Sequence, residues 1–252
     1  MRRGVLLILS LILLAVFVSV AGTLLLATLA RPSVSVPASA TLNMRIEAPW
    51  SEIEPADVFQ QLFSTGPSLR ATIDAIRRAK QDSRIRALVI RPATQSALWG
   101  QLQEMHAALL DFRDSGKPVI AYLEAASTGD YYLATAADRV VLMPAGQLDL
   151  AGLVSYELFF RGALDKVGIY PDLLHIGDYK SASNTFTERG FTPEHREMTE
   201  SLNRDWYDGL VAAIATGRNV SAERARELVD GGPYLAAEAL EARARFARRQ
   251  AI

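Results

Sequence analysis

Short apolar runs that alternate with amphipathic segments restrict most strongly how this chain can fold. Three of the runs, at 86–91 ("RALVIR"), 119–123 ("VIAYL") and 139–144 ("RVVLMP"), have the length and residue types of buried strands. Between the first two, apolar residues advance by four, three, four and three, the spacing of one helix face: Leu98, Leu102, Met105, Leu109 and Phe112. The alternation predicts an α/β fold whose mainly parallel sheet is buried on both faces and flanked by helices.

The same patterns predict the remaining elements. Thr192 followed by Pro193 marks one helix start, and Ser221 marks another. We expect strands at 41–46 and 172–176 and helices at 69–79, 155–167 and 193–216, with one more helix from Ser221.

An uncharged apolar run of 27 residues, at 4–30, precedes this pattern. As a helix it would be roughly 40 Å long, more than the ~30 Å hydrocarbon core of a bilayer. It is also longer than the apolar region of a cleaved signal peptide, about 7 to 15 residues. We therefore expect one N-terminal transmembrane helix as an uncleaved anchor at 1–31, with a cleaved signal peptide as the alternative. A stalk at 32–44 and a single domain at 45–252 would follow.

Composition excludes several classes of function. A net charge of -1 argues against a nucleic-acid partner, because such proteins usually concentrate basic charge on one face. The chain has no cysteine, and its three histidines have no metal-ligand spacing, so we expect neither thiolate catalysis nor a metal or cofactor.

Lysine is rare in this chain, with four residues against 23 arginines. Lys80 and Lys166 fall near the ends of expected helices, and Lys117 lies in a helix exit, where a cation complements exposed carbonyls. Lys180, in "HIGDYKSASNTF", has no such explanation. The choice of lysine over arginine there indicates a chemical need for an amine.

Four motifs occur in the order of a known peptidase family. They are "SGKPVIAY", "AASTGDYYLATAADRVVLMP", "GDYKSA" and "GGPYLAAEAL". Together they resemble the protease IV family of signal peptide peptidases, serine peptidases with a Ser-Lys dyad on a ClpP/crotonase-like fold. The resemblance covers roughly residues 45–242 and implies that fold for the domain.

The resemblance implies a role for each candidate site residue. Lys180 would be the general base, a task that arginine cannot perform because guanidinium stays protonated in proteins. Thr128 falls at the position of the nucleophile, and Ser127 is one residue earlier. The neighbours Gly129, Asp149 and Ser181 would border the substrate.

Two other residues near these positions have simpler interpretations. Asp130 is expected to start a helix, and His175 is expected to end a strand, as a core or edge histidine or as a partner of Lys180.

The sequence departs from the family pattern at the nucleophile. Short members carry "S-G-G-Y-Y" where this chain has "TGDYY", and the glycine-rich oxyanion turn after the preceding strand is replaced by "RPATQS". Long members contain two copies of the domain, of which the first supplies the lysine and the second the serine. By this resemblance the chain corresponds to a lysine-supplying first half.

The C-terminal end is atypical of the family. Family domains continue past "PYLAAEAL" with a "G-L-V-D" turn, whereas this chain continues with "EARARFARRQAI". A truncated or interrupted reading frame and a helix with a basic end are the two explanations.

Three functions stay open. In the first, Lys180 activates a serine from a second domain or chain, and apolar peptides such as cleaved signal peptides are hydrolysed. In the second, Thr128 or Ser127 acts with Lys180 in one chain. In the third, the domain is a catalytically inactive, membrane-tethered binding or scaffold module.

The resemblance and the apolar run also predict location and partners. We expect a single-pass protein of the inner (cytoplasmic) membrane that takes peptide substrates and forms a homo-oligomer or pairs with a serine-bearing domain. Arg2 and Arg3 precede the apolar run, a bias that favours an internal N-terminus and a domain facing the periplasm or the cell exterior.

Overall fold

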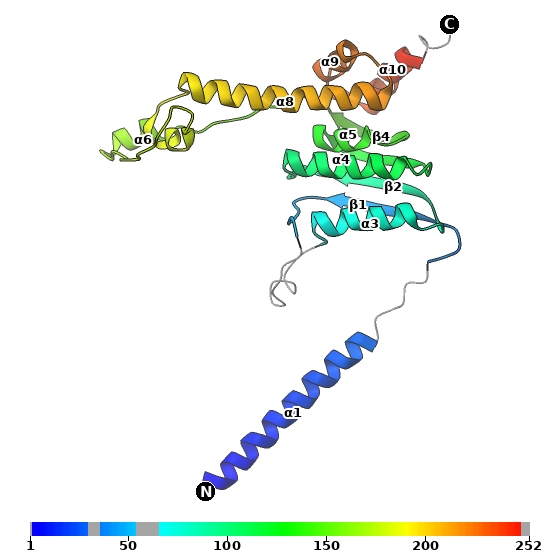
Figure 1. The fold of residues 1–252 in the computed structure, drawn as a ribbon, viewed down its shortest axis with the longest axis vertical. Helices are drawn as coiled ribbons and strands as arrows, with labels where there is room; N and C mark the ends of the chain where they lie inside the picture. The colour runs from blue at the N-terminus through cyan, green and yellow to red at the C-terminus, as the bar shows by residue number, and fades with distance from the viewer. Residues whose placement is uncertain (1, 30–35, 54–65, 248–252) are drawn as a thin grey trace. The chain divides into compact units, whose positions relative to one another are not determined.

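A computed structural model of the chain describes residues 2–29, 36–53 and 66–247. The chain divides into two compact units, Met1–Ala38 and Ser39–Ile252. The first unit contains helix α1 (Arg2–Leu29), in which Leu6–Leu25 are long and apolar enough to cross a membrane by length and composition. The second unit contains every other described helix and strand and is drawn in Figure 1.

The second unit is built on one five-stranded sheet. Its strand order is β1-β2-β3-β4-β5; the first three pairings are parallel, and β5 pairs with β4 antiparallel. A mainly parallel sheet is what the sequence predicts, so the α/β class is confirmed. The strands are β1 (Ala40–Glu47), β2 (Ile85–Ala93), β3 (Val119–Ser127), β4 (Arg139–Asp149) and β5 (Tyr234–Leu235).

Helices connect and extend the strands. Two predicted helix starts are confirmed: the hydroxyls of Thr192 and Ser221 each accept a hydrogen bond, from the backbone N–H of His195 and of Arg224. The helices are α3 (Leu69–Gln81), α4 (Trp99–Arg113), α5 (Thr128–Ala134), α6 (Arg161–Lys166), α7 (Asn184–Thr187), α8 (Pro193–Arg218), α9 (Ala222–Asp230) and α10 (Ala236–Ala247), with a 3₁₀ turn at Ser181–Ser183.

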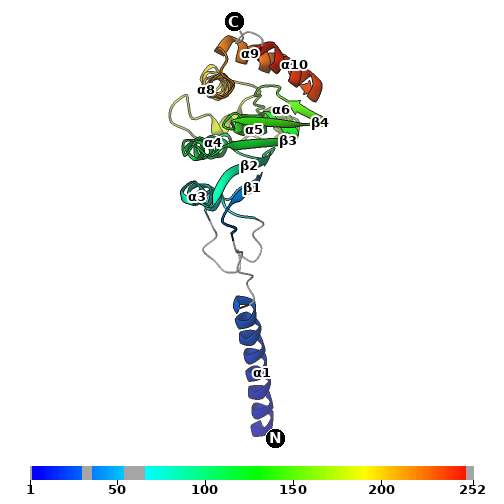
Figure 2. The same ribbon diagram turned by 90° about the vertical axis from the view of Figure 1, so that its right-hand side faces the viewer.

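Burial on both faces of the sheet is the first expectation that the structure overturns. Leu88 and Ile90 of β2 are fully buried, but their neighbour Val89 is half-buried and Arg91 is exposed. Figures 1 and 2 show α3 and α4 on the same side of the sheet. The first four strands follow one another in chain order and pair in parallel, so right-handed crossovers place the helices between them, α3, α4 and α5, on one face. The core therefore lies between that face and its helices.

The segment between β4 and α8 departs furthest from the sequence prediction. We call residues 151–192 the arm. The helix expected at 155–167 is reduced to α6, and the strand expected at 172–176 is absent because these residues pair with no described strand. Leu174 and Ile176 are 96% and 93% exposed. The apolar run that resembles a buried strand is therefore a surface segment in the single chain.

Two boundaries also differ from expectation. β1 (Ala40–Glu47) confirms the strand expected at 41–46, and because it pairs with β2 from Ala40 onward it begins inside the segment expected as stalk. The C-terminal segment is helical in α10 as far as Ala247, and residues 248–252 lie outside the described part of the chain.

Candidate functional site

The turn from β3 into α5 is organised around one buried carboxylate. Asp130 is 1% exposed, and its Oδ1 accepts hydrogen bonds from the backbone N–H and the hydroxyl of Thr94, each at 2.7 Å. Its Oδ2 accepts from the N–H and the hydroxyl of Ser127, at 2.9 and 2.7 Å. Asp130 starts the helix as predicted and also links the end of β2 to the end of β3.

Both hydroxyls considered as nucleophiles are engaged within this turn. Ser127 is the N-cap of α5: its Oγ donates to Asp130 and accepts from the Asp130 N–H. The Thr128 hydroxyl lies 3.2 Å from the carbonyl oxygens of Asp149 and Gly152, toward which it donates. The Thr128 hydroxyl faces only carbonyl oxygens in these hydrogen bonds, and the carboxylate that faces Ser127 already accepts three other hydrogen bonds, so neither hydroxyl is paired with lysine or histidine as a base.

Gly129 and Asp149 also have structural roles at this turn. A Cβ on Gly129 would lie 3.0 Å from Cδ1 of Leu102 and 3.2 Å from the Thr94 hydroxyl, so the glycine permits close packing of α5 on α4. Asp149 is the exposed last residue of β4, and its carbonyl receives the Thr128 hydroxyl.

Lys180 lies in the arm, on a turn between α6 and α8. The Lys180 N–H donates to the Gly177 carbonyl at 3.2 Å, and Gly177 has a φ of +92°, which favours glycine. Lys180 itself is exposed, whereas the next residue, Ser181, is 8% exposed. The amine therefore projects from a turn whose following residue anchors it to the arm.

This turn lines an open pocket of about 570 Å³. His175 lines it too, but it is exposed and its Nδ1 lies 3.2 Å from the Gly177 carbonyl, so it is neither a core nor a strand-end histidine. The pocket is lined by Leu173, Leu174, His175, Tyr179, Lys180, Ser181, Ala182, Ser183 and Phe186. The lysine thus lies among apolar side chains that the single chain leaves open to solvent.

Polar contacts give the arm a defined shape. The Asp165 carboxylate pairs with Arg161 and with Arg189, at 2.6 Å for the latter, and these guanidiniums lower the pKa of Asp165 below its usual value, with Arg189 the larger cause. The Phe160 N–H donates to the Thr185 carbonyl at 2.7 Å. These contacts hold α6 beside the chain that follows Lys180.

The structure does not bring the lysine and the α5 turn together. The C-terminal half of α8 packs on the body of the unit through the buried side chains of Leu210, Val211 and Ile214. Figure 1 shows α6 and the chain around it at the opposite end of α8 from α5. Of the sequence-predicted site residues, Lys180 and Ser181 share a pocket, and Ser127, Thr128, Gly129 and Asp149 cluster at the α5 turn.

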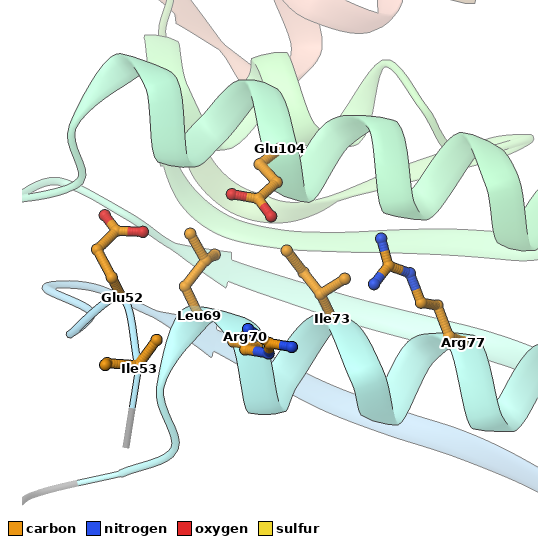
Figure 3. Close-up of a pocket in the computed structure, with 7 residues that line it drawn as sticks. All are labelled: Glu52, Ile53, Leu69, Arg70, Ile73, Arg77 and Glu104. Atoms are coloured by element: carbon orange, nitrogen blue, oxygen red, sulfur yellow. The ribbon is translucent and has the colours of Figure 1, made fainter. Parts of the chain in front are cut away.

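A second pocket, of about 340 Å³, lies between α3 and α4 (Figure 3). Leu69 and Ile73 form its floor, and Glu104 reaches toward it from α4. Its lining combines two carboxylates, two guanidiniums and three apolar side chains: Glu52, Ile53, Leu69, Arg70, Ile73, Arg77 and Glu104. It contains neither a hydroxyl nor an amine, so it does not offer the predicted chemistry. Among the residues that the structure describes, no group of three His, Asp or Glu side chains could hold a metal ion.

Sequence reasoning missed two residues that shape these sites. Thr94 holds Asp130 from the end of β2, and the spacing Ser127-x-x-Asp130, a capping box, was the available signal for half of that network. Glu197 of α8 accepts a hydrogen bond from the Tyr179 hydroxyl, next to Lys180. No local pattern predicts that contact, because the two residues are 18 positions apart.

A protein-family model matches the chain. The model of peptidase family S49 matches residues 111–244, more than half of the chain. "Protease 4" of Haemophilus influenzae is 32% identical over 151 residues, which are 60% of this chain and 25% of that protein. "Serine protease SPPA, chloroplastic" of Arabidopsis thaliana is 28% identical over 183 residues, 71% of this chain and 26% of that protein. The chain spans about a quarter of the length of these relatives.

Solved structures resemble the chain only loosely. A membrane-bound stomatin-specific protease has a TM-score of 0.44 at 12% identity and covers 82% of this chain, which covers 77% of it. An enoyl-CoA hydratase from a Polaromonas species has a TM-score of 0.31 at 18% identity, with 85% and 90% covered. At these scores the likenesses carry no argument about function.

Proposed function

The chain belongs to peptidase family S49, and on that premise we propose that it is the lysine-bearing half of a membrane-anchored serine peptidase. Lys180 would act as general base for a serine hydroxyl supplied by a second domain or a second chain. The observation that carries this proposal is the location of Lys180: an amine on a protruding arm, apart from Thr128 and Ser127, the two hydroxyls considered as nucleophiles.

The closed α5 turn supports an external nucleophile. An oxyanion hole needs N–H groups that are free to meet a developing negative charge. At this turn the N–H groups of Thr94 and Ser127 already donate to the Asp130 carboxylate. The complete single-chain enzyme, with Thr128 or Ser127 as nucleophile, is therefore the less supported alternative.

The apolar surface of the arm supports a partner that covers it. A soluble surface rarely leaves so many large apolar side chains uncovered together. A partner seated there would exclude water from Lys180, and an ammonium in a dry site gives up its proton more readily. The exposed large apolar residues of the arm are Val154, Tyr156, Leu158, Phe160, Val167, Ile169, Tyr170, Leu173, Leu174, Ile176, Tyr179 and Phe186.

The proposed reaction follows from a neutral amine beside a hydroxyl. Nζ of Lys180 would accept the proton of the partner's serine as its oxygen attacks the carbonyl carbon of the peptide bond. The same proton would pass to the leaving amine, and the acyl-enzyme would be hydrolysed by a water that Nζ deprotonates in turn. The partner would supply the oxyanion donors as well as the serine.

Substrate and location belong to the same proposal. The apolar lining around Lys180 favours apolar peptides, and the resemblance of the sequence motifs to signal peptide peptidases favours released signal peptides among them. Helix α1 would anchor the chain in the inner membrane, with the second unit facing the periplasm or the cell exterior.

The test uses the full chain in detergent, alone and with a serine-bearing S49 domain, and follows hydrolysis of an apolar peptide. We expect hydrolysis only in the mixture, and its loss in Lys180→Ala and Lys180→Arg. In the mixture, Thr128→Ala and Ser127→Ala should hydrolyse the peptide as fast as the original chain when the rate is calculated per folded molecule. Hydrolysis by the chain alone that disappears in Thr128→Ala would favour the single-chain enzyme.

A silent binding module is the second candidate, because the exposed amine and the apolar arm would also suit a peptide-holding scaffold. In that case the mixture would bind the peptide without cleaving it, and Lys180→Ala would change neither property.

A further inference from the structure

The Lys180 turn has few features that fix it in place. A catalytic base must be held within about 0.5 Å of its productive position by supported neighbours. Lys180 lies outside any helix or strand, and residues 172–180 are all exposed. The contacts that hold this turn therefore decide whether the Lys180 amine has a fixed position, as a catalytic base requires.

One side-chain contact ties this turn to a long helix. The Tyr179 hydroxyl donates to Oε2 of Glu197 at 2.9 Å, and Glu197 lies in the first two turns of α8. The carboxylate raises the pKa of the Tyr179 hydroxyl, with this hydrogen bond as the main cause. The ring of Tyr179 thus bridges from the residue beside Lys180 to α8.

The chain is fixed differently on the two sides of Lys180. On the C-terminal side of Lys180, Ser181 is buried and begins the 3₁₀ turn, which fixes the chain there. On the N-terminal side, the side chain of Tyr179 is 57% exposed. In the hydrogen bonds that the structure describes, only its hydroxyl reaches another element. Lys180 therefore lies between one anchor made by burial and one made by Tyr179 and Glu197.

We propose that Tyr179 and Glu197 are positioning residues for Lys180: their hydrogen bond fixes the lysine-bearing turn against α8. The inference rests on the proposed function for its catalytic consequence, but the mechanical part concerns this chain alone. The two parts can be measured separately.

Hydrogen exchange of the full chain in detergent measures the mechanical part. Tyr179→Phe removes only the hydroxyl, and we expect backbone amides in 177–183 to exchange about three- to tenfold faster. Glu197→Ala should match it, the double variant should add nothing further, and Glu197→Gln, which keeps an acceptor oxygen, should remain within about twofold of the original chain. Tyr156→Phe, another exposed tyrosine of the arm, is the matched control and should change nothing in 177–183.

Steady-state kinetics with an added serine-bearing S49 domain and an apolar peptide measure the catalytic part. A misplaced base slows the chemical step, so we expect kcat to fall about three- to tenfold with KM unchanged in Tyr179→Phe and Glu197→Ala, and Glu197→Gln to restore it. Because both side chains are exposed, the denaturant midpoint of these variants should equal that of the original chain.

Each outcome bears on one claim. Unchanged exchange in 177–183 for Tyr179→Phe overturns the proposal whatever the activity. Faster exchange with an unaltered kcat in an active mixture overturns it as well. If the original chain with its partner hydrolyses no peptide, the proposed function fails, and the exchange result alone decides the tie between Tyr179 and Glu197.

Discussion

At the scale of single residues, Asp130 shows how a helix-start carboxylate can close a turn. Four donors from Thr94 and Ser127 meet its two oxygens in a site that is 1% exposed. The Thr94 hydroxyl and N–H come from the chain after β2, so the carboxylate joins the ends of two neighbouring parallel strands.

Removing this carboxylate should be costly. In Asp130→Ala, buried donors of Thr94 and Ser127 lose their acceptor, and we expect the free energy of unfolding to fall by about 3–5 kcal/mol. Denaturant unfolding of the full chain in detergent measures the change. Asp149→Ala removes an exposed carboxylate nearby and should cost at most about 0.5 kcal/mol; a similar loss in both variants would contradict the assigned role of Asp130.

His106 makes the stability depend on pH. It lies between helices, its Nε2 is 2.9 Å from the Thr135 hydroxyl, and its ring stacks on Tyr132. Burial, with a smaller contribution from the charge of Arg113, lowers the pKa of His106 from 6.5 to about 4. The folded chain therefore keeps this ring neutral where the unfolded chain binds a proton.

The sign of the effect follows from these values. Stability from the neutral ring is complete above about pH 6.5 and is lost as the pH falls from 6.5 toward 4. We expect a loss of about 2–3 kcal/mol across this interval, measured by denaturant unfolding at several pH values. In His106→Gln this share of the pH dependence should be gone, and an identical pH profile in the two proteins would refute the assignment.

At the scale of elements, α8 does two different things along its length. Its C-terminal half is packed, and Arg218 donates to the Ala134 carbonyl at the end of α5 at 2.6 Å. Its N-terminal half carries the arm, and of its residues only His195 is buried. One half of the helix is therefore packed on the body of the unit, and the other half supports the arm that carries Lys180.

Close packing of α8 on α5 depends on a glycine. A Cβ on Gly217 would lie 2.2 Å from the Thr135 carbonyl oxygen, a backbone atom that cannot move aside easily. We expect Gly217→Ala to lower the free energy of unfolding by at least about 2 kcal/mol. Gly209, in the same helix, has nothing within 4 Å of its Cβ position, so Gly209→Ala should raise stability by about 0.5–1 kcal/mol. Unfolding curves of the two variants that shift in the same direction would contradict this packing argument.

At the scale of the whole molecule, two surfaces of the second unit are not covered by other described elements: the arm and the open face of the sheet. Arg91 on that face is 3.2 Å from Glu124 and lies over the ring of Tyr122 at 5.3 Å, which makes the face partly polar. The arm is far more apolar, so the arm is where we expect a serine-bearing domain or a second copy to bind.

Removing apolar side chains from the arm should separate association from stability. Leu174 and Ile176 are almost fully exposed, so Leu174→Ser combined with Ile176→Ser should leave the free energy of unfolding of the single chain within about 0.5 kcal/mol of its original value. Binding to the partner domain should weaken about tenfold or more, because two apolar side chains lose their burial at the interface.

Binding is measured by light scattering or sedimentation in detergent, together with peptide hydrolysis. The matched control is Leu240→Ser in α10, an apolar residue that is 64% exposed and lies outside the arm. If the control weakens association as much as the arm variant does, the arm is not the docking surface.

Lysine usage shows what a sequence can and cannot assign. Lys117 was expected to complement carbonyls at a helix exit, and its Nζ does cap carbonyls, but those of Ala79, Lys80 and Asp82 at the end of α3, at 2.8–2.9 Å. Lys80 pairs with Asp111 of α4. The type of interaction was predictable from the residue, whereas its partner depended on which helices pack together.

By itself the sequence determined the local and periodic parts of this protein. Strands β1 to β4, the helices between them, the caps at Thr192 and Ser221, and the family that the motifs indicate all follow from residue order, because turns, caps and amphipathic faces depend on near neighbours. Only the tertiary structure decided that the sheet is covered on one face and that residues 172–176 form a surface segment. It also decided that Lys180 lies apart from Thr128. An apolar run has the same pattern whether it is buried within its own chain or left for a partner, so its environment is fixed by the packing of distant segments.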